Sequence, residues 1–171
     1  MICIRPIRES DVESFRETLD AVCRERKYLA RSEAPPLQNV RAFIEANVRA
    51  GHPQFVAEED GRVVGWCDAL PDHEKFGRAH VAILGMGILR DYRGRKIGSR
   101  LLDAVIVATR LRDLEKIELV VHASNTPAVT LYRKTGFEIE GVKKRGLLVD
   151  GEYDDVILMG LSLQTRKQPQ P

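Results

Sequence analysis

One stretch of the chain, residues 79–111, restricts the possible folds more than any other because it joins a strand, a tight turn and a helix. The apolar run HVAILGMGIL is followed by the basic, glycine-bearing turn RDYRGRKIG and then by the amphipathic run SRLLDAVIVATRLR. A turn of this kind directs several backbone N–H groups at one point, which is how many proteins bind phosphate. The stretch therefore predicts a phosphate-bearing ligand at the start of the helix.

Signals for two helices precede this stretch. We expect a short strand over residues 2–7 and then a helix whose first turn carries a capping box of Ser10 and Glu13. A second amphipathic helix is predicted over residues 37–50, and Gly51 is placed to end it. The two helices and the segment between them are candidates for one wall of a substrate pocket, although amphipathic packing alone would also explain them.

Two Asp-Gly pairs predict β-hairpins, because Asp-Gly between two strand-like runs is a strong hairpin signal. The pair at residues 60–61 joins the runs QFVAEE and RVVGWCDAL. The pair at residues 150–151 joins two long strands expected over residues 137–149 and 152–163.

A strand over residues 116–123 and a short helix complete the series. Asn125 and Pro127 are typical of a helix start, and Gly136 is placed to end that helix. The order of elements is then strand, two helices, three strands, helix, strand, helix and two strands. This order predicts an α/β (α+β) three-layer sandwich in which four helices flank a mixed sheet of about seven strands.

The bulk composition favours one ordinary globular domain and gives no sign of a highly charged partner. We expect a single domain over residues 1–163 and a disordered tail over residues 164–171, since QTRKQPQP lacks apolar residues. With 27 Lys and Arg against 25 Asp and Glu, the net charge of +2 does not call for nucleic acid or a membrane surface.

The cysteine pattern and the N-terminus predict a cytoplasmic protein without a metal site. The three cysteines are scattered, which is typical of reduced core thiols: Cys3, Cys23 and Cys67. The N-terminal residues MICIRPIRESD form no apolar leader, and the longest uncharged apolar run, AVIVA, is too short to cross a bilayer.

Two motifs resemble those of a known family. The first motif is YRGRKIGSRLL, in which Arg93 and Gly98 match the two ends of the family's signature, and the second is NTPAVTLYRKTGF. They resemble motifs of the GNAT superfamily of acetyl-CoA-dependent N-acetyltransferases. The resemblance extends over nearly the whole chain and implies the GNAT sandwich, with a mostly antiparallel sheet. Lys96 departs from the pattern, since it stands where the family usually has its middle glycine. A Cβ there could crowd the pyrophosphate; we favour the view that the Lys ammonium adds a charge-assisted contact.

The resemblance implies a cofactor site for acetyl-CoA, the acyl donor. The strand end at residues 86–88 would hydrogen-bond the pantetheine arm, residues 94–99 would hold the pyrophosphate, and Asn125 would bind the arm or serve only as a helix cap. Tyr132 would donate to the departing thiolate or merely pack at a helix edge. The implied residues are Met86, Gly87, Ile88, Arg93, Gly94, Arg95, Lys96, Ile97, Gly98, Ser99, Asn125 and Tyr132.

The reaction implied is direct attack of a primary amine on the acetyl thioester through a tetrahedral intermediate whose oxyanion is held by backbone N–H groups near Ile88. An aliphatic ammonium with a pKa of ~10 must first lose a proton. The positions where the family carries a glutamate base are Ala82 and Val120, which cannot titrate. His122 is the preferred substitute as catalytic base because its ordinary pKa of ~6.5 leaves it mostly neutral at working pH. A lone histidine on a strand is nevertheless more often structural.

Other titratable side chains lie near these strands in the sequence. Two flank the substituted positions and are further candidates for the base: His80 and Glu118. Four others border the expected pocket mouth and could bind a cationic amine: Asp68, Asp72, His73 and Glu74. The acidic residues of the last hairpin could also bind substrate, although such a cluster usually faces solvent: Glu152, Asp154 and Asp155.

The expected acceptor is the primary amine of a small molecule or amino acid. Acetylation of a protein N-terminus or lysine is the alternative, and a narrow pocket around residues 31–38 would favour the small molecule. A third interpretation is a non-catalytic CoA-binding module, prompted by Lys96 and the missing glutamate. The family resemblance also predicts a homodimer, because final hairpins of this kind pair between subunits.

Overall fold

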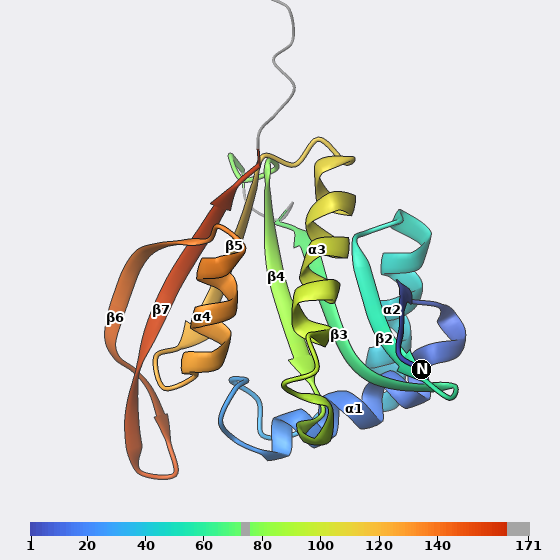
Figure 1. Ribbon diagram of the computed structural model, residues 1–171, viewed down its shortest axis with the longest axis horizontal. Coiled ribbons are helices and arrows are strands. Elements are labelled where there is room, and N and C mark those ends of the chain that lie inside the picture. Colours follow the sequence, from blue (N-terminus) through green and yellow to red (C-terminus); the bar gives the residue numbers. More distant parts are fainter. Residues whose placement is uncertain (73–75, 164–171) are drawn as a thin grey trace, which may run out of the picture.

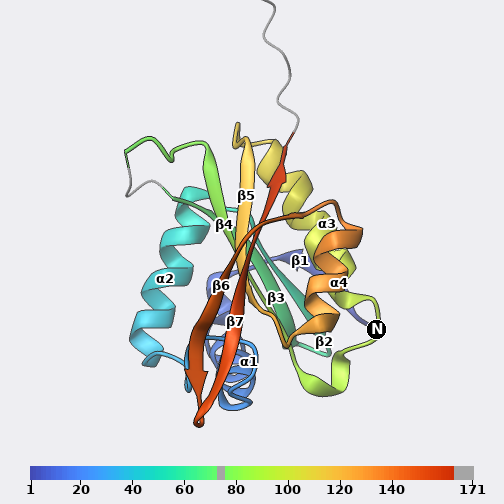
Figure 2. The ribbon, with the colours of Figure 1, turned by 90° about the vertical axis from the view of Figure 1, so that its left-hand side faces the viewer.

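Helices cover both faces of a seven-stranded sheet in the computed structural model of the chain (Figures 1 and 2). The structure describes residues 1–72 and 76–163. The expected disordered tail, residues 164–171, and two of the residues expected at the pocket mouth, His73 and Glu74, therefore lie outside the described residues.

The elements follow the order expected from the sequence. They are β1 (Cys3–Pro6), α1 (Val12–Arg24), α2 (Leu37–Ala50), β2 (Gln54–Glu59), β3 (Arg62–Pro71), β4 (Val81–Ile88), α3 (Ile97–Arg110), β5 (Lys116–His122), α4 (Thr126–Lys134), β6 (Glu138–Val149) and β7 (Glu152–Ser162). The prediction of seven strands and four helices in an α/β fold is confirmed for the described residues.

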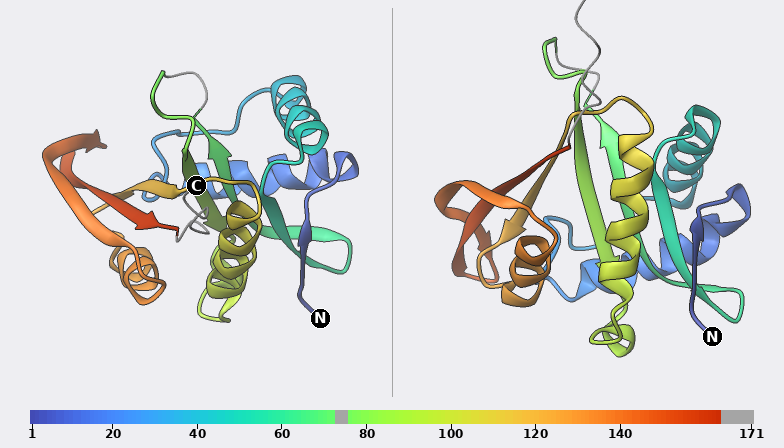
Figure 3. Two further views of the ribbon diagram at one scale, coloured as in Figure 1. Left: turned by 90° about the horizontal axis from the view of Figure 1, so that it is seen from above. Right: turned by 45° about the horizontal axis from the view of Figure 1, so that its top comes forward.

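The strands lie in the order β1-β2-β3-β4-β5-β7-β6, and every neighbouring pair is antiparallel except β4 and β5. The parallel pair is joined by α3, since a parallel connection needs a long crossover. Pairing between β4 and β5 covers only residues 81–83 and 116–118. The remainder of β5 pairs with β7 instead, so the end of β4 diverges from the second half of the sheet. Figure 3 shows the β6–β7 hairpin and α4 on the far side of β4 from β1 and β2.

Two hydrophobic cores hold the layers together. The larger core fills the space between one face of the sheet and helices α3 and α4, with Leu101, Leu102 and Ile117 fully buried in it. The smaller core packs α1 and α2 on the opposite face, where Phe15 meets the edge of Trp66 with ring centroids 5.5 Å apart. Each helix buries its apolar stripe, which explains why the helical periodicities in the sequence were informative.

The expected capping box of Ser10 and Glu13 is wrong. The chain makes a short 3-10 turn over Glu9–Asp11, and the Asp11 carboxylate accepts the Arg8 backbone N–H at 2.8 Å. Arg5 donates to both oxygens of that carboxylate, at 2.7 and 2.8 Å. Helix α1 begins at Val12, one residue later than an N-cap at Ser10 would require.

Candidate active site

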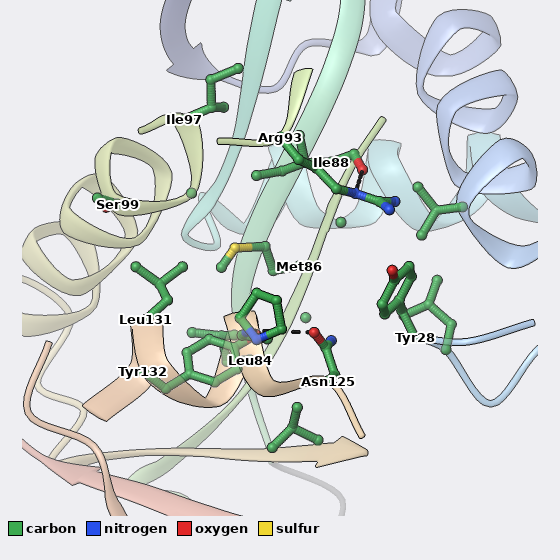
Figure 4. Close-up of a pocket in the computed structure, with 18 of the residues that line it drawn as sticks. Tyr28, Leu84, Met86, Ile88, Arg93, Ile97, Ser99, Asn125, Leu131 and Tyr132 are labelled. Atoms are coloured by element: carbon green, nitrogen blue, oxygen red, sulfur yellow. Dashed lines mark hydrogen bonds between the residues drawn. The ribbon is translucent and has the colours of Figure 1, made fainter. Parts of the chain in front are cut away.

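A pocket of about 370 Å³ lies where β4 and β5 diverge, and the end of α1, the start of α3 and helix α4 close its sides (Figure 4). It brings together eleven of the twelve residues expected to bind the cofactor. They are Met86, Gly87, Ile88, Arg93, Gly94, Lys96, Ile97, Gly98, Ser99, Asn125 and Tyr132. Arg95 is not among the lining residues, and its guanidinium lies 5.0 Å from the centroid of the Tyr92 ring.

The turn before α3 is built to receive an anion. Gly94 and Lys96 both have positive φ angles, 76° and 59°, which fold the backbone into a tight loop. None of the N–H groups of residues 94–99 donates to an acceptor within the part of the chain that the structure describes. Because α3 begins at Ile97, its positive dipole end adds to these free donors. The residues present therefore fit a phosphate group.

The side chain of Arg93 is occupied by the protein itself. Its Nε donates to the Ile88 carbonyl at 2.9 Å, and its two terminal nitrogens donate to Glu25, just after α1. The guanidinium also lies 4.6 Å from the centroid of the Tyr28 ring. Arg93 thus ties the turn to the α1 end of the pocket, which leaves the backbone amides as the principal donors for a phosphate.

The two glycines of β4 have a role that the sequence did not reveal. Pairing of β3 with β4 is regular through Gly85 and Gly87, so neither glycine makes a bulge in that pairing. A Cβ on Gly87 would lie 2.2 Å from the Trp66 ring, and a Cβ on Gly85 would lie 3.0 Å from Asp68 Oδ1. The glycines make room for side chains of β3, and the pocket arises from the divergence of β5.

Asn125 and Tyr132 reach the pocket from the two ends of α4. The Asn125 side chain accepts the Ala128 N–H at 3.3 Å, so it caps the helix and also lines the pocket. Tyr132 is buried beside Phe137, and burial raises the pKa of its hydroxyl. That hydroxyl has no hydrogen bond among the described residues and remains available as a donor.

None of the three candidate bases lines the pocket: His80, Glu118 and His122. His122 is buried away from it, with Nδ1 3.9 Å from Asp154 Oδ2. Ala82 is fully buried in the larger core, whereas Val120 lines the pocket. Hydrogen bonds from Arg78 and then Lys116 hold the pKa of Glu118 below its ordinary value. His80 is exposed before β4 and does not line the pocket.

The acidic residues expected near the mouth or on the last hairpin are largely paired within the chain. Asp72 accepts Arg78 Nε at 2.6 Å, and Asp154 accepts the Ser124 hydroxyl at 2.6 Å. Asp155 accepts the Lys144 ammonium at 2.8 Å, whereas Glu152 is exposed at the start of β7. Among the residues that the structure covers, no cluster of three or more His, Cys, Asp or Glu side chains is placed to hold a metal ion.

Several lining residues were not predicted. Tyr28 and Leu29 lie in the segment between α1 and α2, which was expected as a candidate pocket wall, although no pattern singled out these two residues. The wall expected from residues 31–38 is not part of this pocket. Leu131 and Pro127 face the pocket from α4, and their helical spacing could have indicated them.

Comparison with known proteins identifies the family to which these features correspond. The family model described as "Acetyltransferase (GNAT) family" matches residues 13–137. The chain is 37% identical over 112 residues to the L-amino acid N-acetyltransferase AaaT of Escherichia coli K12, covering 65% of this chain and 68% of the relative. It is 30% identical over 136 residues to an L-methionine sulfoximine/L-methionine sulfone acetyltransferase of Pseudomonas paraeruginosa, covering 78% of each.

Among solved structures, the fold is close to that of yncA, a putative acetyltransferase from Salmonella typhimurium determined with its cofactor acetyl-CoA. The TM-score is 0.91, the sequence identity is 19%, and the match covers 99% of this chain and 98% of the other. At this identity the likeness establishes the common fold. Within the described residues, no helix is long and apolar enough to span a membrane.

Proposed function

Because the chain belongs to the GNAT family of acetyltransferases, we propose that it transfers the acetyl group of acetyl-CoA to the α-amino group of an L-amino acid. The observation that carries this proposal is the pocket, in which the free amides of residues 94–99 and the diverging edge of β4 meet. The free amides would bind a pyrophosphate, and the diverging edge of β4 would bind an extended pantetheine arm. The two amino-acid acetyltransferases among the relatives support the choice of acceptor.

The proposed reaction is direct transfer without a covalent enzyme intermediate. The acceptor nitrogen attacks the thioester carbonyl carbon, the carbonyl oxygen becomes an oxyanion near the Ile88 backbone, and the carbon–sulfur bond then breaks. Of the two protons that the ammonium loses, one ends on the CoA sulfur and one leaves to solvent. The proposal thus requires a hydrogen-bond donor at the sulfur and a proton acceptor at the amine.

Tyr132 is the proposed donor at the departing sulfur. Since burial raises the pKa of its hydroxyl, the group stays protonated and stabilises the developing thiolate by a hydrogen bond rather than by giving up its proton. Its position beside the pocket and its free hydroxyl support this role.

A panel of acceptors tests the proposed function. The purified protein is incubated with acetyl-CoA and with single L-amino acids, polyamines or a peptide with a free N-terminus, and release of CoA thiol is measured together with the mass of the product. We expect N-acetyl amino acids, and no product from amino acids whose amine is already acetylated. Acetylation of the peptide alone would replace this proposal with the protein-acetylating alternative. Protection from heat by acetyl-CoA without turnover would indicate a binding module.

A cytoplasmic homodimer is part of the proposal. Large apolar side chains are exposed on the β6–β7 hairpin, which supports pairing of this hairpin with a second copy: Ile139, Val142, Leu148 and Tyr153. The three cysteines are free, as expected in a reducing compartment. Light scattering on the eluting protein measures the mass in solution, and a monomer at working concentration would contradict the dimer.

A further inference from the structure

A buried carboxylate lies beside the pocket on the face of the sheet opposite to Tyr132. Asp68 of β3 pairs in register with Gly85 of β4, and only 7% of its surface is exposed. It lies two residues after Trp66, which packs against α1, so both side chains face the α1–α2 layer. An acid in the otherwise apolar run VVGWCDAL has no packing reason to be there.

The absence of a side chain at Gly85 lets this carboxylate extend over β4. A Cβ on Gly85 would lie 3.0 Å from Asp68 Oδ1, so the carboxylate occupies the space that a side chain at residue 85 would take. Gly85 itself lines the pocket. Beyond it, β5 has already diverged from β4. The Asp68 carboxylate therefore lies directly beside a residue that lines the pocket, on the face of the sheet that is turned toward α1 and α2.

On the β2 side, the neighbour of Asp68 is a buried amide side chain with a donor that is unpaired in the described part of the chain. Gln54 of β2 pairs in register with Asp68, and its side-chain carbonyl oxygen accepts a hydrogen bond from the Asn47 side-chain amide at 3.0 Å. Its Nε2 is fully buried and has no partner among the described residues. A buried donor without an acceptor costs free energy, so the polar residues beside Asp68 are held in an environment that does not fully satisfy them.

No cation neutralises Asp68 within the described residues. Burial raises its pKa to about 7, and a hydrogen bond with the Gly85 backbone opposes this effect only in part. On the same face of β5, Glu118 is paired with Arg78 and Lys116, and His122 lies beside Asp154. On β3 the adjacent Cys67 is a buried thiol, and the facing residues of α2 and β2 are the uncharged Asn47 and Gln54.

We propose that the Asp68 carboxylate binds the ammonium group of the acceptor and takes its proton before the amine attacks. This deepens the proposed function, on which it rests, by supplying the base that the family positions Ala82 and Val120 cannot provide. The proton moves from the ammonium nitrogen to a carboxylate oxygen, the neutral amine attacks, and the protonated Asp68 returns its proton to solvent. An ionised carboxylate with no cation of its own is suited to a cationic amine and would reject an anionic group.

The test is the pH dependence of kcat/KM for the wild type and for Asp68→Asn. The asparagine keeps the size of the side chain and an acceptor for the Gly85 N–H. The wild type should lose activity toward acid with an apparent pKa of about 7. The variant should be slower by about 10²-fold at neutral pH. Because it can use only the free amine, its deficit should shrink by about tenfold for each pH unit up to the pKa of the amine.

Two further variants and one direct measurement keep the test decisive. Asp103→Asn, which changes an exposed carboxylate of α3, should leave the profile as it is. Loss of the acid limb in His122→Gln but not in Asp68→Asn would overturn the proposal and identify His122 as the base. Carbon NMR of the Asp68 carboxyl, assigned by its loss in Asp68→Asn, should show titration at about pH 7.

The NMR titration separates this proposal from the proposed function. If no amino acid is acetylated, the proposed function fails, and the titration still decides the state of Asp68. Titration of that carboxyl near its ordinary value of ~3.9 would overturn the proposal whatever the enzyme acetylates. Acetyl-CoA affinity of Asp68→Asn is expected to match the wild type, and its thermal stability at neutral pH should be no lower, because a carboxyl whose pKa is raised by burial destabilises the fold when it is ionised.

Discussion

Lys96 allows the backbone of the phosphate turn and the charge of its side chain to be tested separately. The residue adopts a left-handed conformation, with φ 59° and ψ 14°, immediately before α3. An L-residue in this region costs about 1–2 kcal/mol, whereas glycine adopts it freely. Glycine also raises the entropy of the unfolded chain, which costs about 0.4–1 kcal/mol. Lys96→Gly should therefore stabilise the fold by about 1 kcal/mol or less, raising Tm by about 1–4 °C.

The effect on acetyl-CoA binding depends on the ammonium. An exposed ion pair between an ammonium and a phosphate contributes about 0.2–1 kcal/mol, so its loss should weaken binding by at most about fivefold. Lys96→Gln removes the charge and keeps the left-handed backbone. Asp113→Gly relieves another positive φ, 54°, at an exposed site outside the pocket. Scanning calorimetry measures Tm, and titration calorimetry measures the dissociation constant at two salt concentrations.

Each variant has its own expected outcome. Lys96→Gly and Asp113→Gly should both raise Tm, while Lys96→Gln should not. Both Lys96 variants should weaken acetyl-CoA binding to the same small extent, and less so at high salt. A lower Tm for Lys96→Gly would refute the strain argument. Complete loss of binding in both variants would show that the ammonium is an essential phosphate ligand.

Three other perturbations follow from the geometry. Tyr132→Phe should lower kcat by about 10²-fold and leave acetyl-CoA affinity within about twofold, because it removes only the donor at sulfur; steady-state kinetics and calorimetry check both. Gly87→Ala should cost about 1–3 kcal/mol in urea denaturation, since its Cβ would lie 2.2 Å from the Trp66 ring, and wild-type stability would contradict this. Burial raises the pKa of Asp11, but hydrogen bonds from Arg5 and Arg8 outweigh it and the net pKa is lowered. Its stabilisation is thus present above the unfolded-state pKa of ~3.9 and lost as pH falls through the lower folded value. Asp11→Asn should lose about 1.5–3 kcal/mol at neutral pH and show a flatter acid limb in unfolding measurements, and an unchanged limb would argue against the ion pair.

Local signals in the sequence predicted most elements because the interactions that form them are local. The turn at residues 60–61 joins β2 and β3 as expected, and Gly51 ends α2 with a left-handed φ of 63°. Asn125 caps α4, also as expected. At the start of α1 local reasoning was wrong, because the deciding contact is between Asp11 and Arg5, a residue of another element.

The sequence by itself determined the series of strands and helices, the glycine-bearing turn before α3 and the family. These depend on residue types at short spacings, where backbone preferences and hydrophobic periodicity act. Only the tertiary structure decided where the pocket opens and how Asp68 lies relative to it. The divergence of β5 from β4 depends on which strand β5 pairs with next. The place of Asp68 over Gly85 depends on the register of β3 and β4. Register and strand divergence arise from packing of the whole sheet between its helices, so no local pattern could have shown that Asp68 lies over Gly85 or that His122 lies outside the pocket.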